Sequence, residues 1–481
     1  MMQTHFQVLS KDERDQIHER TLKILARTGV RVDTAKGRRF LKEAGALVDE
    51  NTHIVRFPNR LVEESLRLTP NNFSLGARRP GWDLHMNSGD CTLLLSGEGT
   101  RTLDRKTGAH RDSTFHDWLE ATRLADALDD IGIYWRIVQA SDRDYTILNY
   151  VEYISTLFRN FSKHVQDPIY SKAEAPWLLE VLQTIFGSKE AIRQKHPLSF
   201  VLCPQSPLVI DEQYTDAYLE LVGWDIPVAV MPMPLMGATA PASQIATVVL
   251  SNCEVLATLC LVQAAEPGVP FIYAPISALM DPRSGMLKSG AIERAAMSAT
   301  TTEMARYYGF AAETSGYSTG QFVPSMQAGY ERALNVLPAV LSWPDILVGA
   351  GLLGSSIILS LEQMLIDAEV FRMCKQAHRG IVCHEGKWLD DEIDRIGPGG
   401  HFLEQNSTAR AVRGDEWYIG QLGIDASFEE WEAAGKPDLV EEARDMVDQI
   451  LSSHEPLALD AEINRELDRI RKSAADNLHK K

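Results

Sequence analysis

The feature that most constrains the fold is an alternation of short apolar runs with longer helical runs, from about residue 116 to residue 376. Eight of the runs have the length and composition of buried strands. They are IGIYWRIVQ (131–139), KHVQD (163–167), LSFVLCP (198–204), PVAVMPM (227–233), PFIYAPI (270–276), FAAETSG (310–316), DILVGAG (345–351) and IILSL (357–361). Helix-like stretches separate most of them, at 145–160, 173–187, 211–223, 243–265, 289–307 and 326–341. The eighth run leads into a helix that ends near Cys374.

Eight strands that alternate with helices predict a (β/α)8 barrel, an α/β fold of the TIM type. A doubly wound open sheet is the rival, but the apolar runs continue well past the six strands usual for it. Residues 9–70 read as N-terminal helices and 72–112 as a small β-rich insert. The chain after 380 is acidic and helical, which suggests helices wrapped round the barrel. We therefore divide the chain into 1–115, a barrel at 116–376 and a C-terminal helical extension at 377–481.

Charge and cysteine content exclude several classes of protein. The chain carries 48 Lys and Arg against 66 Asp and Glu, a net charge of −18, which argues against nucleic acids and anionic membranes as partners. Its six cysteines include no CxxC pair, so a zinc ribbon or disulfide framework is not expected. The N-terminal sequence lacks the apolar core of a signal peptide, and we predict a cytoplasmic protein. The uncharged stretch 226–253 is interrupted by four prolines, which argues against a membrane span.

Familiar catalytic motifs are weak or missing in this sequence. GAGLLG (349–354) matches a dinucleotide fingerprint by its letters only, because a strand-like run follows it instead of a helix. His164, His378 and His384 stand apart from one another, and CHE (383–385) is the single close Cys/His group. The sequence therefore predicts no bound metal.

Aromatic, sulfur-bearing and polar residues do lie where the strands are expected to end, which is where barrel enzymes build their sites. They are Tyr134, Met233, Tyr273, Tyr317 and Phe322, with Gln205, Glu313 and Gln327 as polar members. Aromatic faces attract a quaternary ammonium by about 0.5–2 kcal/mol each, and polar groups would fix the other end of such a ligand. Each aromatic residue could instead fill the barrel core, and each polar residue could serve a structural hydrogen bond.

Several segments resemble the trimethylamine methyltransferase family, in order and over about residues 8–450. The resemblance is carried by HERTLKILARTGVRV, LDRKTGAHRDST, LCPQSPLVI, PMPLMGATAPAS, SNCEVLATL, EPGVPFIYAP, MQAGYERA and HFLEQNSTARAV. It implies a TIM barrel that moves a methyl group from a methylated amine to the cobalt of a separate corrinoid protein. The cofactor and the nucleophile, Co(I), would then belong to that cognate partner, and the catalytic residues of this chain stay unknown.

The resemblance also bears on the methyl donor. The trimethylamine enzymes of this family carry pyrrolysine, whereas this sequence has only the twenty standard residues and resembles the non-pyrrolysine branch. Glycine betaine, proline betaine and carnitine are the known kinds of donor in that branch, and glycine betaine, giving dimethylglycine, is our first expectation. A quaternary amine leaves as a neutral amine, so an enzyme for it needs no strong general acid. The oligomeric state stays open between a monomer and a homo-oligomer.

The connection after the sixth run, STGQFVPSMQAGYERALN (318–335), is expected to form part of the pocket rim. Tyr317 and Phe322 would line it and Gln327 would anchor the donor, unless the stretch is only a long connection. Two other classes of function remain. A conventional barrel lyase or aldolase would need a Schiff-base lysine or a metal at a strand end, and Lys163 is the only lysine near one. A non-catalytic betaine-binding protein would hold the donor without turnover.

Overall fold

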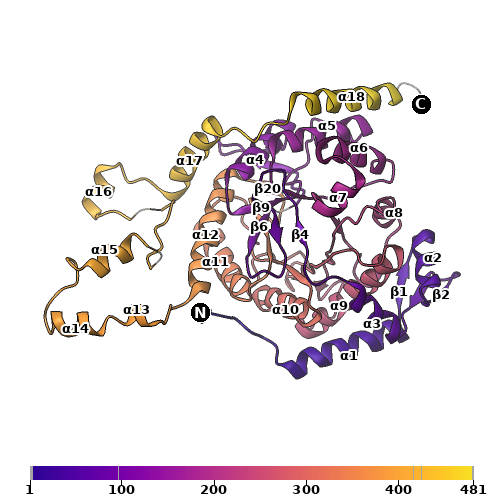
Figure 1. Ribbon diagram of the computed structural model, residues 1–481, viewed down its shortest axis with the longest axis horizontal. Coiled ribbons are helices and arrows are strands. Elements are labelled where there is room, and N and C mark those ends of the chain that lie inside the picture. The colour runs from indigo at the N-terminus through magenta and orange to yellow at the C-terminus, as the bar shows by residue number, and fades with distance from the viewer. Residues whose placement is uncertain (1–3, 96, 415, 424, 479–481) are drawn as a thin grey trace.

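The computed structural model describes residues 4–95, 97–414, 416–423 and 425–478, and a closed barrel of parallel strands lies at its centre (Figure 1). The strands follow one another round the barrel as β6 (Thr92–Leu95), β9 (Ile131–Tyr134), β10 (His164–Gln166), β11 (Leu198–Leu202), β13 (Val228–Val230), β15 (Phe271–Tyr273), β17 (Ala311–Ser315) and β18 (Ile346–Ala350). The last strand, β18, pairs in parallel with β6 and closes the ring. The predicted (β/α)8 barrel is thus confirmed.

Each barrel strand is followed by a helix that packs on the outside of the ring. These helices are α4 (Phe115–Ala127), α5 (Ile147–Asn160), α6 (Ala175–Phe186), α8 (Gln213–Leu219), α9 (Gln244–Ala265), α10 (Glu293–Tyr308), α11 (Met326–Leu341) and α12 (Leu361–Arg379), with a short extra helix, α7 (Lys189–Lys195), after α6. Two layers of core result, because side chains alternate along a strand. One set fills the barrel and the other fills the space between strands and helices.

The prediction of the eighth strand was wrong. The barrel strand is β6, which lies in the segment expected to be a small β insert, so the barrel begins before residue 116. The run IILSL instead forms β20 (Ile358–Leu359), which pairs with β19 (Leu352–Leu353) in a hairpin and extends a sheet with β7 (Arg101–Leu103) and β8 (His110–Asp112). Gly351 and Gly354 make this hairpin possible, because both have a positive φ, of 92° and 58°. The exact limits of the three-part division stay a prediction, and its outer ends, residues 1 and 481, lie outside the described residues.

The N-terminal segment covers one side of the barrel. Helices α1 (Lys11–Arg27), α2 (Ala35–Glu43) and α3 (Asn59–Leu68) all pack against α9. A four-stranded sheet lies beside them, in the order β12 (Val209–Ile210), β1 (Val30–Val32), β3 (Ile54–Arg56) and β2 (Leu47–Asp49). Two-stranded pairs, β4 (Ser74–Leu75) with β5 (Leu84–His85) and β14 (Leu235–Met236) with β16 (Ala278–Leu279), complete the strands.

Helix α9 is the one helix of the described chain that is long and apolar enough to cross a membrane by length and composition. Most of it is buried inside the body, and its one carboxyl group, Glu254, accepts hydrogen bonds from Ser206 Oγ and the Leu208 amide at 2.8 Å each. Burial raises the pKa of Glu254 to about 7. Helix α9 is therefore part of the protein core, and its Glu254 holds the loop that follows β11.

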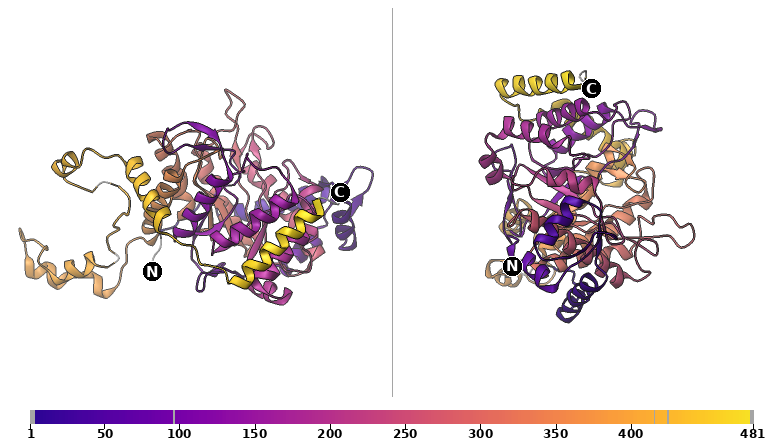
Figure 2. Two further views of the ribbon diagram at one scale, coloured as in Figure 1. Left: turned by 90° about the horizontal axis from the view of Figure 1, so that it is seen from above. Right: turned by 90° about the vertical axis from the view of Figure 1, so that its right-hand side faces the viewer.

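The C-terminal segment follows two different courses. Helix α17 (Leu439–Ser453) packs on α12 and α4, and α18 (Ala461–Leu478) packs on α5 and α6, as predicted for wrapping helices. Residues 380–414, 416–423 and 425–437, here called the arm, lead away from the barrel over most of their length and return to α12 at Tyr418 and to the core at Leu422. They carry the short helices α13 (Glu385–Trp388), α14 (Asp390–Ile396), α15 (Asn406–Val412) and α16 (Phe428–Ala433) (Figures 1 and 2). None of these four helices buries a residue, and Ile381 and Leu403 are 83% and 82% exposed.

Limited digestion with trypsin should cut the arm first. Arg395 and Arg410 are exposed in a segment that packs little apolar surface, and such segments open at low cost. The C-terminal fragment should stay bound to the barrel, because α17 and α18 pack on it. Gel filtration of the nicked protein followed by denaturing electrophoresis measures both expectations. First cuts within the barrel helices would contradict this account of the arm.

Candidate active site at the carboxyl ends of the barrel strands

The inside of the barrel is lined mainly by small and medium apolar side chains. The buried members are Leu75, Met86, Leu94, Ile133, Val201, Ala229, Met231, Ile272, Ala274, Ala311, Ile346 and Val348. Trp135, Cys203 and Ile276 are partly buried beside them, each just beyond the last residue of its strand. This end of the ring is where barrel enzymes place their substrates. The polar groups among these apolar residues therefore identify the candidate site.

A column of hydrogen-bonded polar side chains crosses this interior. His164 Nδ1 lies 3.0 Å from the Gly76 carbonyl oxygen, and His164 Nε2 lies 2.9 Å from Ser199 Oγ. Ser199 Oγ is 3.1 Å from Gln166 Oε1, and Gln166 Nε2 is 2.9 and 3.1 Å from the two carboxyl oxygens of Glu313. All four side chains are fully buried. The column links one wall of the barrel, at β10 and β11, to the opposite wall at β17.

The hydrogen-bond directions in this column depend on the charge of Glu313. Burial lowers the pKa of His164 to about 3, so this ring is neutral. If Nδ1 donates to Gly76, Nε2 must accept the single hydroxyl proton of Ser199. The Gln166 amide then satisfies every contact when its NH2 faces Ser199 and its oxygen accepts a proton from neutral Glu313. Ionised Glu313 favours the opposite orientation of the amide, because it can only accept.

Glu313 itself is a carboxyl group in apolar surroundings. Burial raises its pKa to about 8, while the hydrogen bond from Gln166 acts in the opposite direction. The group is therefore largely protonated near neutral pH and would ionise if a cation came close. Cys203, near both Glu313 and Glu98, has a thiol pKa raised to about 12 by burial and by these carboxyls. Cys203 therefore stays a neutral thiol and does not act as a nucleophile.

Trp135 brings an aromatic face to the same end of the barrel. A Cβ placed on Gly97 would meet the indole ring at 2.6 Å, so Gly97 lets the backbone lie directly against this ring. The indole Nε1 is buried and has no hydrogen-bond partner among the described residues. Tryptophan is the aromatic side chain that attracts a cation most strongly. Trp135 and Glu313 together thus offer an aromatic and an acidic group to a cationic ligand.

An arginine completes the polar groups at the end of β17. Arg294 lies in the first turn of α10, and its guanidinium donates from Nη2 to Ser315 Oγ at 3.1 Å and from Nη1 to the Ser289 carbonyl at 3.1 Å. Ser315 is two residues from Glu313, so both side chains point to the inside of the barrel. Arg294 is 7% exposed, and burial lowers its pKa to about 10.

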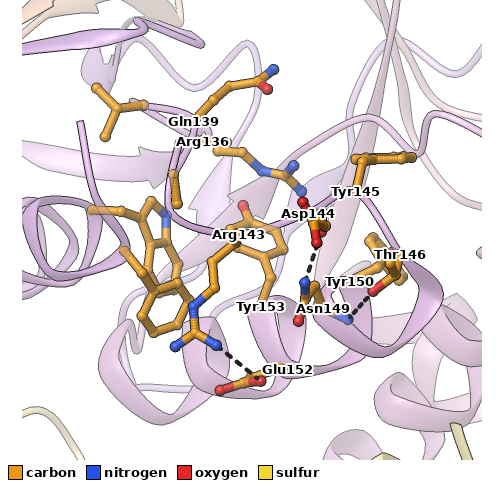
Figure 3. Close-up of a pocket in the computed structure, with 14 residues that line it drawn as sticks. Arg136, Gln139, Arg143, Asp144, Tyr145, Thr146, Asn149, Tyr150, Glu152 and Tyr153 are labelled. Carbon is orange, nitrogen blue, oxygen red and sulfur yellow. Dashed lines mark hydrogen bonds and ion pairs between the residues drawn. The ribbon is translucent and has the colours of Figure 1, made fainter. Parts of the chain in front are cut away.

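A second group of charges lies just outside the ring, beyond the ends of β9 and β10. The guanidinium of Arg136 lies 3.6 Å from the ring centroid of Tyr153 and 3.5 Å from Asp167 Oδ2. Arg136 and Tyr153 line a pocket of about 110 Å³ (Figure 3), which is also lined by Arg143 and Glu152, an ion pair at 3.8 Å. The pocket shares none of its lining with the interior column. This pocket is therefore separate from the polar column inside the barrel.

Three of the predicted site residues face the core between the strands and the helices and not the barrel interior. Tyr134 accepts a hydrogen bond from the indole of Trp118, Tyr273 donates to Asn252 Oδ1 at 2.9 Å, and Tyr317 donates to the Asp367 carbonyl at 2.7 Å. All three rings are buried in the core between strands and helices. The expectation that they line a pocket is corrected for this reason. At the end of β9 the aromatic residue that faces the barrel interior is Trp135, which follows Tyr134.

The other predicted residues are dispersed over the same end of the barrel. Met233 is 53% exposed and Gln205 is exposed beyond β11. Phe322 is 60% exposed, and its ring lies against Gly354, where a Cβ would meet Phe322 Cδ1 at 3.0 Å. Gln327 is exposed and donates to Glu331 at 2.8 Å. The structure therefore puts only Glu313 in the interior, and the substrate-binding role of the exposed four stays a prediction.

Lys163 does not have the position of a Schiff-base lysine. Its ammonium group is buried and donates to the carbonyl oxygens of Ala125, Leu128 and Ile131 at 3.1, 2.6 and 2.7 Å. It stands before β10 and not after it, and thus at the amino end of that strand, whereas barrel enzymes place their sites at the carboxyl ends. Burial lowers its pKa to about 8, but the three carbonyls hold it in a structural role. The lyase or aldolase alternative loses its candidate residue.

A closed parallel barrel with polar groups at the carboxyl ends of its strands defines the β/α-barrel class of enzymes. The chain belongs to the trimethylamine methyltransferase family, whose model matches residues 2–475. It is 28% identical over 470 residues to a trimethylamine methyltransferase of Methanosarcina barkeri (strain Fusaro), covering 96% of this chain and 94% of the relative. It is also 28% identical to a glycine betaine methyltransferase of Desulfitobacterium hafniense (strain Y51), over 463 residues and 96% of both chains.

The fold agrees with this assignment. The crystal structure of the monomethylamine methyltransferase of Methanosarcina barkeri superimposes with a TM-score of 0.53, covering 98% of this chain and 88% of that chain. At 10% identity the likeness shows a shared fold and nothing finer. The protein is thus a methyltransferase of the methylamine type, as the resemblance implied.

Proposed function

We propose that the protein transfers a methyl group from glycine betaine to the Co(I) of a cognate corrinoid protein in the cytoplasm, leaving dimethylglycine. The observation that supports this donor is the buried Glu313 in a barrel that is otherwise mainly apolar. A trimethylammonium group suits such a site, because its methyl groups pack on apolar walls while its charge stabilises the ionised carboxylate. The full-length likeness to a glycine betaine methyltransferase supports the same donor.

The reaction divides the chemistry between two proteins. The corrinoid of the partner supplies the nucleophile, which accepts the methyl carbon while the electron pair of the broken C–N bond stays on nitrogen. The amine leaves neutral, so no proton has to be delivered. The task of this chain is to bind the donor, exclude water and aim one N–CH3 bond at the partner, and orientation of this kind contributes several kcal/mol.

The charge change also limits how strong the cation site should be. The positive charge on nitrogen fades as the methyl group leaves, so a tight cation cage would stabilise the ground state more than the transition state. A single carboxyl whose pKa is about 8, in a barrel interior that also packs against one indole ring, is a moderate cation site. We therefore expect modest ground-state affinity for the ammonium end of the donor.

The proposal is tested anaerobically. The purified protein is mixed with Co(I) cobalamin, or with a cognate corrinoid protein, and with one donor at a time: glycine betaine, proline betaine, carnitine, choline or trimethylamine. We expect loss of the Co(I) absorbance and formation of dimethylglycine with glycine betaine. Turnover with proline betaine or carnitine alone would keep the reaction and replace the donor. Tight betaine binding without transfer to either acceptor would make the protein a binding protein.

A further inference from the structure

Arg294 differs from the other buried arginines of the described chain. Arg332 pairs with Asp367 at 2.6 Å, Arg38 with Glu50 at 2.8 Å and Arg136 with Asp167 at 3.5 Å. Arg294 is buried to a similar degree, yet within the described residues it donates hydrogen bonds to a hydroxyl and a carbonyl, and no carboxylate there pairs with it. A buried cation without a counter-ion is costly to fold, because neither water nor an anion compensates its charge. A ligand that supplies an anion would compensate this charge.

The position of Arg294 defines which part of a ligand it would meet. Its guanidinium reaches Ser315 at the end of β17, while Glu313 stands two residues earlier on the same inner face, about 7 Å along the strand. One strand end therefore presents a cation and an acid side by side. A ligand that matches both carries a positive charge at one end and a negative charge at the other.

Arginine is suited to a carboxylate in particular. Its planar fork can donate two parallel hydrogen bonds to the two carboxylate oxygens, a geometry that a lysine ammonium cannot reproduce. The contacts to Ser289 and Ser315 use two of its five N–H groups and hold the fork in place, so donors remain for a ligand.

We propose that Arg294 is the carboxylate anchor of the donor site and restricts the substrate to small zwitterions, in which a quaternary ammonium and a carboxylate lie a short distance apart. This rests on the proposed function for the cationic end, but the anionic end can be tested without it. Choline and trimethylamine, which lack the carboxylate, leave Arg294 uncompensated and bind poorly for that reason.

Calorimetric titration of the purified protein, with no corrinoid present, tests the anchor. The ligands are glycine betaine, choline and 3,3-dimethylbutanoate, in which carbon replaces the cationic nitrogen of the betaine. We expect wild-type protein to bind glycine betaine about 100-fold more tightly than choline. Arg294→Met should weaken glycine betaine by about 100-fold and 3,3-dimethylbutanoate by a similar factor, and choline by less than threefold. Arg294→Lys should recover part of the loss.

Arg306 provides the matched control. It lies in the last turn of the same helix, α10, and pairs with Asp345 at 2.8 Å, away from Ser315. Arg306→Lys makes the same conservative change and should leave all three affinities within twofold of wild type. The melting temperature of Arg294→Met should not fall, because the change removes an unpaired buried charge.

The outcomes separate the two proposals. Equal weakening of betaine and choline in Arg294→Met, or no weakening of either, overturns the carboxylate anchor even if betaine is turned over. Binding of 3,3-dimethylbutanoate that depends on Arg294, in a protein that methylates no acceptor from any of the cationic donors, supports the anchor and overturns the methyl transfer.

Discussion

Glycine betaine should bind the Glu313→Gln protein about ten- to a hundredfold more weakly than wild type at pH 9, and its affinity should no longer change with pH. The magnitude corresponds to the loss of one buried interaction with a charged group, about 1.5–3 kcal/mol. Glutamine keeps the shape of the side chain and can still donate to Gln166, so the polar column and the fold should persist.

The pH dependence in wild type follows from the raised pKa of Glu313, about 8 in the free protein. The protonated carboxyl must lose its proton to pair with the ammonium group, so affinity should rise with pH up to about 8 and then level off. Titration calorimetry between pH 6 and 9 measures this profile. Glu98 is the control, since its carboxyl also has a raised pKa, about 7, chiefly through burial. A profile that survives in Glu313→Gln and disappears in Glu98→Gln would assign the titration to Glu98.

The second large effect concerns stability. Asp367→Ala should lower the free energy of unfolding by about 3–5 kcal/mol, because it leaves the buried Arg332 without its counter-ion. Asp367 also accepts hydrogen bonds from the Gly351 amide at 2.8 Å and from Gln363 Nε2 at 2.9 Å, and these donors would lose their partner as well. The urea midpoint followed by tryptophan fluorescence measures the change.

The double variant Asp367→Ala/Arg332→Met is the control for this prediction. Removing the cation together with the anion takes away the unpaired charge, so the double variant should be more stable than Asp367→Ala alone. A double variant that is less stable than the single one would show that lost packing, and not the unpaired Arg332, dominates.

The class of fold could be predicted from the sequence because parallel strands buried on both faces read as continuous apolar runs. For the same reason, the sequence does not indicate which side chains face the barrel interior. With apolar residues on both faces, nothing in IGIYWRIVQ tells that Tyr134 points out and Trp135 points in. A shift of one residue moves a side chain from one core to the other.

The interior column could have been found in part from the sequence. In KHVQD, His164 and Gln166 are two residues apart and therefore share a face, an unusual pair of polar residues for a buried strand. The strand Thr92–Leu95 was assigned to the β insert and not to the barrel because it has only four residues among other short runs. IILSL has the composition of a strand but folds into a hairpin. Arg294 could not be identified at all, since a missing counter-ion is a property of tertiary structure.

The burial of α9 by α1, α2 and α3 has a consequence during synthesis of the chain. The 22 residues of α9 form an apolar helix that emerges from the ribosome well before the strands that complete the barrel. The three helices that cover it are all encoded upstream, so they have already been made when it appears. The N-terminal segment can thus act as an internal chaperone, shielding this long apolar helix until the barrel closes.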